Sequence, residues 1–78
     1  MIHVLLNREN ISKILAKRNL SQNAFAQRAG VTSGYLSQLL SGQRHPSPGV
    51  RQRLMDALSG VEFDDLFRVL DGDEGSDS

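Results

Sequence analysis

Residues 21–40 have the sequence Ser21-Gln-Asn-Ala-Phe-Ala-Gln-Arg-Ala-Gly30-Val-Thr-Ser-Gly-Tyr-Leu-Ser-Gln-Leu-Leu40. Ser21 and Thr32 are each a favourable N-cap followed by apolar residues at helical spacing, so two short helices are expected. Gly30 lies between them, where a residue in the left-handed conformation ends a helix. Ala26 is small enough to let the two helices cross closely. The stretch therefore predicts a pair of helices joined by a tight turn.

The flanking sequence predicts further helices around this pair. Asn7 is a favourable N-cap for a helix from Arg8 to about Arg18, with apolar residues at helical spacing on one face. Ser47-Pro48 combines a capping hydroxyl with proline at the first helical position, and Gly60 is expected to end the helix that starts there. Four helices are thus expected between residues 8 and 60.

The two ends of the chain allow alternatives. The apolar residues between 63 and 70 form either a fifth helix or, alternatively, one helical turn over 63–67 and an extended segment over 68–70. His3-Val-Leu-Leu6 is β-prone and too short for a helix. The two ends can pair as a ribbon, because an isolated strand leaves its backbone groups unpaired. The expected fold is an all-α, compact domain of four to five helices over residues 1–70, with or without a short β-ribbon.

The composition excludes several classes of function. A chain of 78 residues that is 38% hydrophobic builds one small core, which argues against a two-domain enzyme. There is no cysteine, so disulfides, cysteine zinc sites and thiol nucleophiles are excluded. His3 and His45 lie in separate segments without metal-ligand spacing, and no phosphate-cradling glycine pattern occurs. We expect neither an enzyme nor a metal or other cofactor.

The formal net charge of zero conceals an asymmetry. Residues 1–61 contain eight basic and two acidic residues, a net charge of +6, whereas residues 62–78 carry −6. A cationic body suits a polyanionic partner, because phosphate contacts release condensed counterions. The alternative is a soluble domain with a solvated acidic end. Residues 71–78 contain no apolar side chain and are expected to form a disordered acidic tail.

No stretch of the sequence approaches the roughly 20 apolar residues that a membrane span needs. The apolar run at the N-terminus is too short for the core of a signal peptide, and no basic region precedes it. We therefore expect a soluble, cytoplasmic protein without a membrane partner.

The helix pair over 21–40 has the spacing of a helix-turn-helix, and a wider similarity surrounds it. Over about residues 8–61 the sequence resembles the family of the lambda repressor, Cro and the xenobiotic-response-element (XRE) regulators. The resemblance implies about five helices that bind double-stranded operator DNA, commonly as a homodimer, and a protein that is nucleoid-associated when bound. The matching blocks are Leu20-Ser21-Gln22, Phe25-Ala26, Ala29-Gly30-Val31, Tyr35-Leu36-Ser37-Gln38-Leu39 and Ser41-Gly42-x-Arg44-x-Pro46-Ser47.

The resemblance also implies roles for single residues. In this family the helix that follows Thr32 lies in the major groove, and its first residues contact base edges. Gln38 is the best candidate for direct readout, since a carboxamide bonds bidentately to adenine N6 and N7. The Tyr35 ring either contacts DNA or packs partly on the first helix. The implied base-reading set is Thr32, Ser33, Gly34, Tyr35, Ser37 and Gln38.

Phosphate contacts are implied on both sides of this helix. Gln22 begins the preceding helix, where similar proteins clamp a phosphate. Arg44 is the first choice in the loop that follows, which runs along the sugar–phosphate backbone in the family. Arg28, Arg51 and Arg53 are expected to be solvated surface. The implied phosphate set is Gln22, Lys17, Arg18, Ser41, Gln43, Arg44 and His45.

The sequence departs from the family pattern within the third helix. Gly34 supplies no side chain where similar proteins often carry a polar base-reading residue. No Lys or Arg lies between Gly30 and Gln43, so the commonest specific contact, a cation on guanine, is missing from this helix. Base readout is therefore expected to be modest, with DNA shape and backbone contacts contributing much of the specificity.

The leading hypothesis is a sequence-specific transcriptional regulator, a dimeric repressor that inserts helix 32–40 into the major groove. The first alternative is the antitoxin of a toxin–antitoxin pair, which would bind its own promoter while its acidic tail wraps a basic toxin. The second is a protein–protein adaptor that uses residues 2–6 and 67–70 as an exposed apolar patch. The same residues could instead form the dimer interface.

Overall fold

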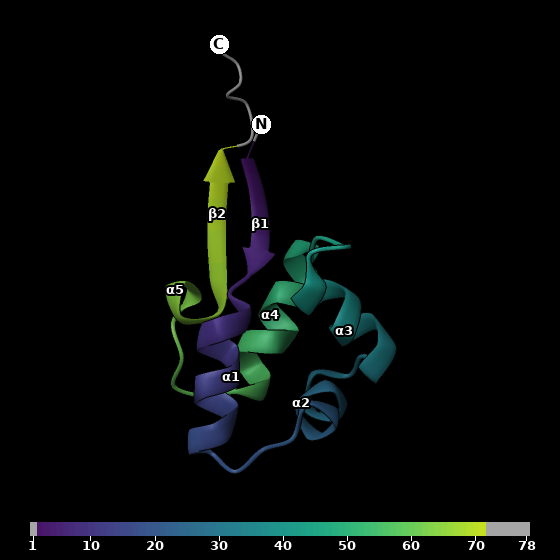
Figure 1. The fold of residues 1–78 in the computed structure, drawn as a ribbon, viewed down its shortest axis with the longest axis vertical. Coiled ribbons are helices and arrows are strands. Elements are labelled where there is room, and N and C mark those ends of the chain that lie inside the picture. Colours follow the sequence, from purple (N-terminus) through teal and green to yellow (C-terminus); the bar gives the residue numbers. More distant parts are fainter. Residues whose placement is uncertain (1, 72–78) are drawn as a thin grey trace.

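Five helices and a two-stranded antiparallel sheet make up the described residues, 2–71, of a computed structural model (Figure 1). The helices gather in one body and the sheet projects from it, as Figure 1 shows. This architecture confirms the expected repressor-like, mainly helical domain with a terminal ribbon. In chain order the elements are β1 (Ile2–Leu6), α1 (Arg8–Lys17), α2 (Gln22–Ala29), α3 (Ser33–Ser41), α4 (Pro48–Ala57), α5 (Phe63–Leu66) and β2 (Phe67–Asp71).

Side-chain caps begin the first four helices. In each case a side-chain oxygen accepts a hydrogen bond, 3.0 to 3.2 Å long, from the backbone N–H three residues later. Each cap satisfies one of the backbone donors that have no partner inside the helix. The expected starts are therefore confirmed. The caps are Asn7 for α1, Ser21 for α2, Thr32 for α3 and Ser47 for α4.

The turn between α2 and α3 is closed by backbone hydrogen bonds. Gly30 has φ +74°, a left-handed conformation that glycine adopts without a steric cost. The N–H of Val31 then donates to the carbonyl of Ala26 over 3.0 Å. Ala26 is fully buried, as the close approach of the two helices requires. The predicted tight turn is confirmed.

The fourth helix ends earlier than the sequence indicated. Gly60 was expected to end it, but α4 ends at Ala57. Leu58 leaves the helix with φ −122° and ψ 72°, and its side chain is completely buried in the core. The N–H of Leu58 donates to the carbonyl of Met55 and the N–H of Val61 to that of Leu58, each over 3.2 Å, so α4 ends in tight turns that lead to Gly60, which has φ +89°.

The core joins all five helices to the base of the sheet. The fully buried side chains include Phe25, the largest of them, at the centre of α2. Leu6 and Phe67 bring the sheet into the same cluster, because they face each other across the two strands. The buried residues are Leu6, Ile11, Leu15, Phe25, Ala26, Ala29, Leu36, Leu39, Leu54, Leu58, Leu66 and Phe67.

The C-terminal segment forms one helical turn followed by a strand. A longer fifth helix, the other expected alternative, does not form. Phe67 and the residues after it instead pair with β1, so both strands exchange backbone hydrogen bonds. The N–H of Asn7 donates to the carbonyl of Leu66 over 2.7 Å, and Asn10 Nδ2 donates to the carbonyl of Asp65 over 2.6 Å. These bonds fix α5 against the start of α1.

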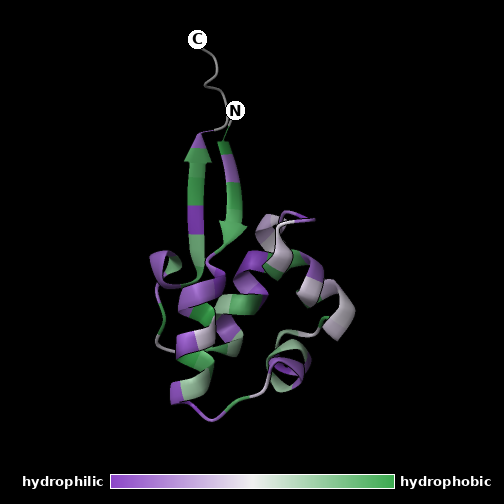
Figure 2. Ribbon diagram, in the orientation of Figure 1, coloured by the Kyte–Doolittle hydropathy of each residue, from purple (hydrophilic) through white to green (hydrophobic). Residues whose placement is uncertain are grey.

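The sheet carries exposed apolar side chains beyond its buried base. Ile2 is 66% exposed, Val69 53% and Leu70 39%. Figure 2 shows both strands as largely hydrophobic where they project from the helices. Asp71, the first residue of the expected tail, is the last residue of β2. The rest of that expected tail, 72–78, lies outside the described residues.

Candidate nucleic-acid interface

The outward face of α3 is polar and uncharged. Leu36 and Leu39 are buried and hold the helix on the core. Ser33, Gly34 and Ser37 are exposed, and the helix contains no acidic or basic residue. A face of this kind offers hydroxyl groups and a carboxamide to a partner without a strong field of either sign.

The residues at the start of α3 differ in how much of each is available to a partner. The Thr32 hydroxyl already accepts a hydrogen bond from the N–H of Tyr35, so it serves the helix as a cap. Tyr35 is half-buried and packs against the core cluster, which leaves part of its ring accessible. Gly34 faces open space, because a Cβ atom built there would meet nothing within 4 Å. The helix can therefore approach a neighbouring surface closely at Gly34.

Gln38 lies at the junction of α3 and the loop that follows it. Its side-chain Oε1 accepts a hydrogen bond from Arg44 Nε over 2.8 Å. Its backbone carbonyl accepts from the N–H groups of Gln43 and Arg44, over 3.0 and 3.3 Å, and from Ser41 Oγ over 3.1 Å. Three of the expected phosphate-contacting residues are thus tied to one expected base-reading residue.

The loop from Gly42 to Ser47 also contacts the rest of the molecule near its C-terminal end. Pro46 is buried, whereas Gln43, Arg44 and His45 are exposed. The His45 ring lies 5.1 Å from the ring of His3 on β1, with an angle of 42° between their planes. The loop is therefore fixed between α3 and the sheet, with its polar side chains outward.

A small hollow of about 110 Å³ lies beside α3. Gln22 from the start of α2 and Ser41 from the end of α3, both expected phosphate contacts, line it together with Ser37. Leu40 and Arg8 complete its lining. Arg8 was not among the expected contacts. The one feature of the sequence that pointed to Arg8 is its positive charge in the first turn of a helix. The helix dipole disfavours a cation there.

Lys17 and Arg18 lie in a different place. Both line a separate hollow together with Gly60, Val61 and Asp65, next to α5. The Arg18 guanidinium donates to the carbonyl of Ser59 over 2.9 Å. The structure therefore brings Gln22 and Ser41 together beside α3, and it ties Arg18 to the segment after α4.

Comparison with known families agrees with this geometry. A family model described as helix-turn-helix matches residues 11–66, from within α1 to the end of α5. No curated protein and no solved structure gives a significant match. Among residues 2–71, no helix is long and apolar enough to cross a membrane.

Proposed function

Because the chain belongs to the helix-turn-helix family of the lambda repressor, Cro and the XRE regulators, a family of DNA-binding regulators, we propose that it is a sequence-specific transcriptional repressor. In this proposal α3 lies in the major groove and the loop after it follows the phosphate backbone. The observation that supports it is the arrangement of α3, whose polar face points outward while Leu36 and Leu39 fix it to the core.

The proposed base contacts come from one face of α3. Gln38 is the main reader, and Ser33 and Ser37 add hydroxyl contacts that discriminate little between bases. Gly34 lets the helix come close to the groove floor, since nothing lies within 4 Å of its missing side chain. Thr32 positions this face as the cap, and Tyr35 supplies ring surface at its edge.

The proposed phosphate contacts flank this face. Gln22 and Ser41 act from the hollow beside α3, and Gln43, Arg44 and His45 act from the exposed loop. We place Lys17 and Arg18 outside the contact with the same half-site, because they line the hollow next to α5. With no cation on α3 itself, much of the affinity would come from the backbone and depend on salt.

The sheet suits a second copy of the chain. Val4 and Val69 face each other across the strands, and Ile2 shares their side of the sheet because side chains alternate. A homodimer that covers this side would remove exposed apolar surface from water. It would also present two α3 helices to successive major grooves, about 34 Å apart on DNA. The protein would then act on chromosomal DNA in the cytoplasm, without enzymatic activity.

Selection from sheared genomic DNA tests this proposal. The protein is incubated with the fragments at roughly 0.15 M salt, where screening is realistic, and the retained DNA is sequenced. A short enriched inverted repeat would support a dimeric operator-binding regulator. Salt-sensitive retention without an enriched sequence would contradict sequence-specific regulation.

The exposed apolar side chains of the sheet also favour a second candidate function. An antitoxin or an adaptor would use Ile2, Val69 and Leu70 to bind another protein rather than a second copy. Stable co-purification of a small basic protein encoded beside this chain would favour the antitoxin. A single species of the mass of the homodimer would argue against both.

A further inference from the structure

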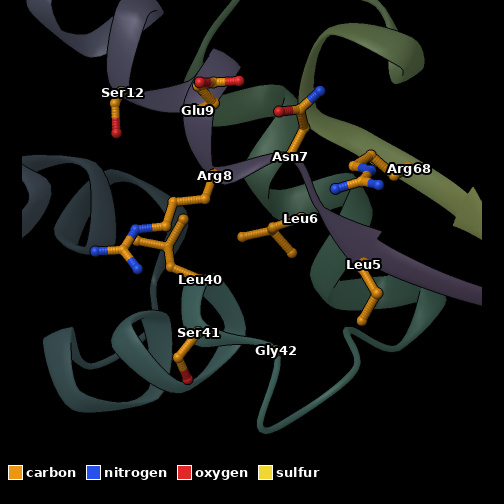
Figure 3. A pocket seen from close by; sticks show the side chains of 10 residues that line it. All are labelled: Leu5, Leu6, Asn7, Arg8, Glu9, Ser12, Leu40, Ser41, Gly42 and Arg68. Carbon is orange, nitrogen blue, oxygen red and sulfur yellow. The ribbon is translucent and has the colours of Figure 1, made fainter.

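Arg8 lies beside the end of α3, although it belongs to the first turn of α1. It lines the 110 Å³ hollow beside α3 and also a larger hollow of about 600 Å³ between that helix and the sheet (Figure 3). Leu40 and Ser41 line both hollows as well, so the two are neighbours. Arg8 therefore lies where the proposed DNA contacts meet the rest of the molecule.

We propose that Arg8 holds a phosphate group of the DNA backbone, together with Gln22 and Ser41. This inference rests on the proposed function, which it extends from α2 and α3 to the start of α1. It assigns a backbone contact to a residue that neither the helix pair nor the loop after α3 contains.

The chemistry of the smaller hollow suits an anion. Its five lining residues offer the Arg8 guanidinium, the Gln22 amide and the hydroxyls of Ser37 and Ser41, and none of them is acidic. A guanidinium presents paired N–H donors that match two phosphate oxygens. The acidic residue nearest in sequence, Glu9, lines only the larger hollow.

The guanidinium of Arg8 has no competing role in the described part of the chain. Arg8 is exposed, and none of its side-chain nitrogens donates a hydrogen bond to residues 2–71. A cation in the first turn of a helix is disfavoured by the helix dipole, so Arg8 does not serve the stability of α1. Both points leave the group available to a ligand.

The side chain is also well placed. Figure 3 shows Arg8 extended beside Leu40, with its guanidinium directed away from the two strands. The apolar stem of an arginine can lie along a leucine while its charged end stays in water. Arg68 on β2 lines the larger hollow but not the smaller one. Arg8 is therefore the arginine that lines the smaller hollow together with Gln22.

A matched pair of variants tests the contact. Arg8→Gln removes the charge at the proposed site, and Arg28→Gln removes the same charge from the exposed last turn of α2, outside both hollows. Affinity for a random duplex and for the selected operator is measured as a function of salt. We expect Arg8→Gln to flatten the slope of log K against log salt by about 0.9, the value for one lost phosphate contact. Both duplexes should lose affinity several-fold and to a similar extent.

Each outcome decides the proposal. If Arg8→Gln and Arg28→Gln give the same slope and affinity, Arg8 holds no phosphate and the proposal is overturned, while the DNA-binding function stands. Arg8→Lys should restore the slope, because it restores the charge. Circular dichroism checks that the variants are folded. If Arg8→Gln is not folded, the comparison of Arg8→Lys with the wild type decides the question. An affinity of Arg8→Lys equal to that of the wild type with both duplexes would overturn the bidentate contact.

A second arm separates this proposal from the proposed function. If the wild-type protein binds no duplex, the proposed function fails, and inorganic phosphate is titrated at constant ionic strength while backbone amide resonances are recorded. Shifts at Arg8, Gln22 and Ser41 that disappear in Arg8→Gln would support a site for free phosphate or a phosphorylated molecule. Their absence would overturn the phosphate site altogether.

Discussion

The Nε atom of Arg44 donates a 2.8 Å hydrogen bond to Oε1 of Gln38. This bond engages the carboxamide oxygen and leaves the amide nitrogen as the free donor. Bidentate recognition of adenine requires the oxygen to accept from N6 while the nitrogen donates to N7. The oxygen keeps a second lone pair, so acceptance from adenine N6 would have to take place beside Arg44, whereas donation to guanine N7 or O6 or to thymine O4 leaves the bond to Arg44 untouched.

Replacement of Gln38 by alanine tests the proposed readout. We expect Gln38→Ala to lose discrimination at one base position of the operator, by about 1–3 kcal/mol, the usual value of a good pair of base contacts. Binding is measured to the operator and to its single-base variants. Gln27→Ala, which changes an exposed glutamine on α2, is the matched control. Undiminished selectivity of Gln38→Ala would show that Gln38 reads no base.

A double-mutant cycle tests the coupling between Gln38 and Arg44. We expect Gln38→Ala and Arg44→Ala to be non-additive in operator binding, with an interaction energy of at least about 0.5 kcal/mol, because the residues share a hydrogen bond. Gln43→Ala in place of Arg44→Ala gives the control cycle. Additive effects of Gln38→Ala and Arg44→Ala would mean that the bond does not position the amide proposed to read a base.

Gly34 and Gly30 should respond in opposite ways to alanine. Gly34→Ala adds a methyl group in open space within a helix and should stabilise the fold by about 0.5–1 kcal/mol. Gly30→Ala places a Cβ at φ +74° and should destabilise it by about 1–2 kcal/mol. Urea denaturation measures both free energies of unfolding. If the close approach of α3 to DNA matters, Gly34→Ala will bind the operator more weakly despite its higher stability, and equal binding would show that it does not.

The homodimer proposal makes Val69 a sensitive position. Val69→Lys places a charge on the exposed apolar side of the sheet, so we expect a lower dimer fraction in sedimentation equilibrium without loss of secondary structure. Asn23→Lys adds the same charge to an exposed position of α2 and serves as the control. Dimerisation that is equally strong in both variants would exclude the sheet as the interface.

Truncation of one core residue should remove a large part of the free energy of unfolding of this small domain. Leu66→Ala removes a completely buried side chain that joins α5 to the core. We expect the free energy of unfolding to fall by about 2–5 kcal/mol, a large share of the total for a small domain. Thermal unfolding followed by circular dichroism gives the change, with the exposed Ser59→Ala as a reference. A loss below 1 kcal/mol would mean that the site collapses around the missing atoms.

The sequence alone determined the features that depend on neighbours in the chain. Asn7, Ser21, Thr32 and Ser47 each cap a helix through a bond that spans three residues, so their effect is visible in the local sequence. The turn at Gly30 is equally local. The helix pair, its outward polar face and the family resemblance all follow from features of this kind.

Tertiary structure decided what depends on contacts between distant residues. The end of α5 at Leu66 is fixed by pairing of the two terminal strands, whose partners, such as Leu6 and Phe67, are far apart in sequence. The bond from Arg18 to the carbonyl of Ser59, 41 residues away, is likewise invisible in the local sequence. Arg8 joins Gln22 and Ser41 only because α1, α2 and α3 share one core. Hydrogen bonds between residues three or four positions apart can be inferred from the sequence, whereas only packing of the folded chain brings together side chains from separate elements.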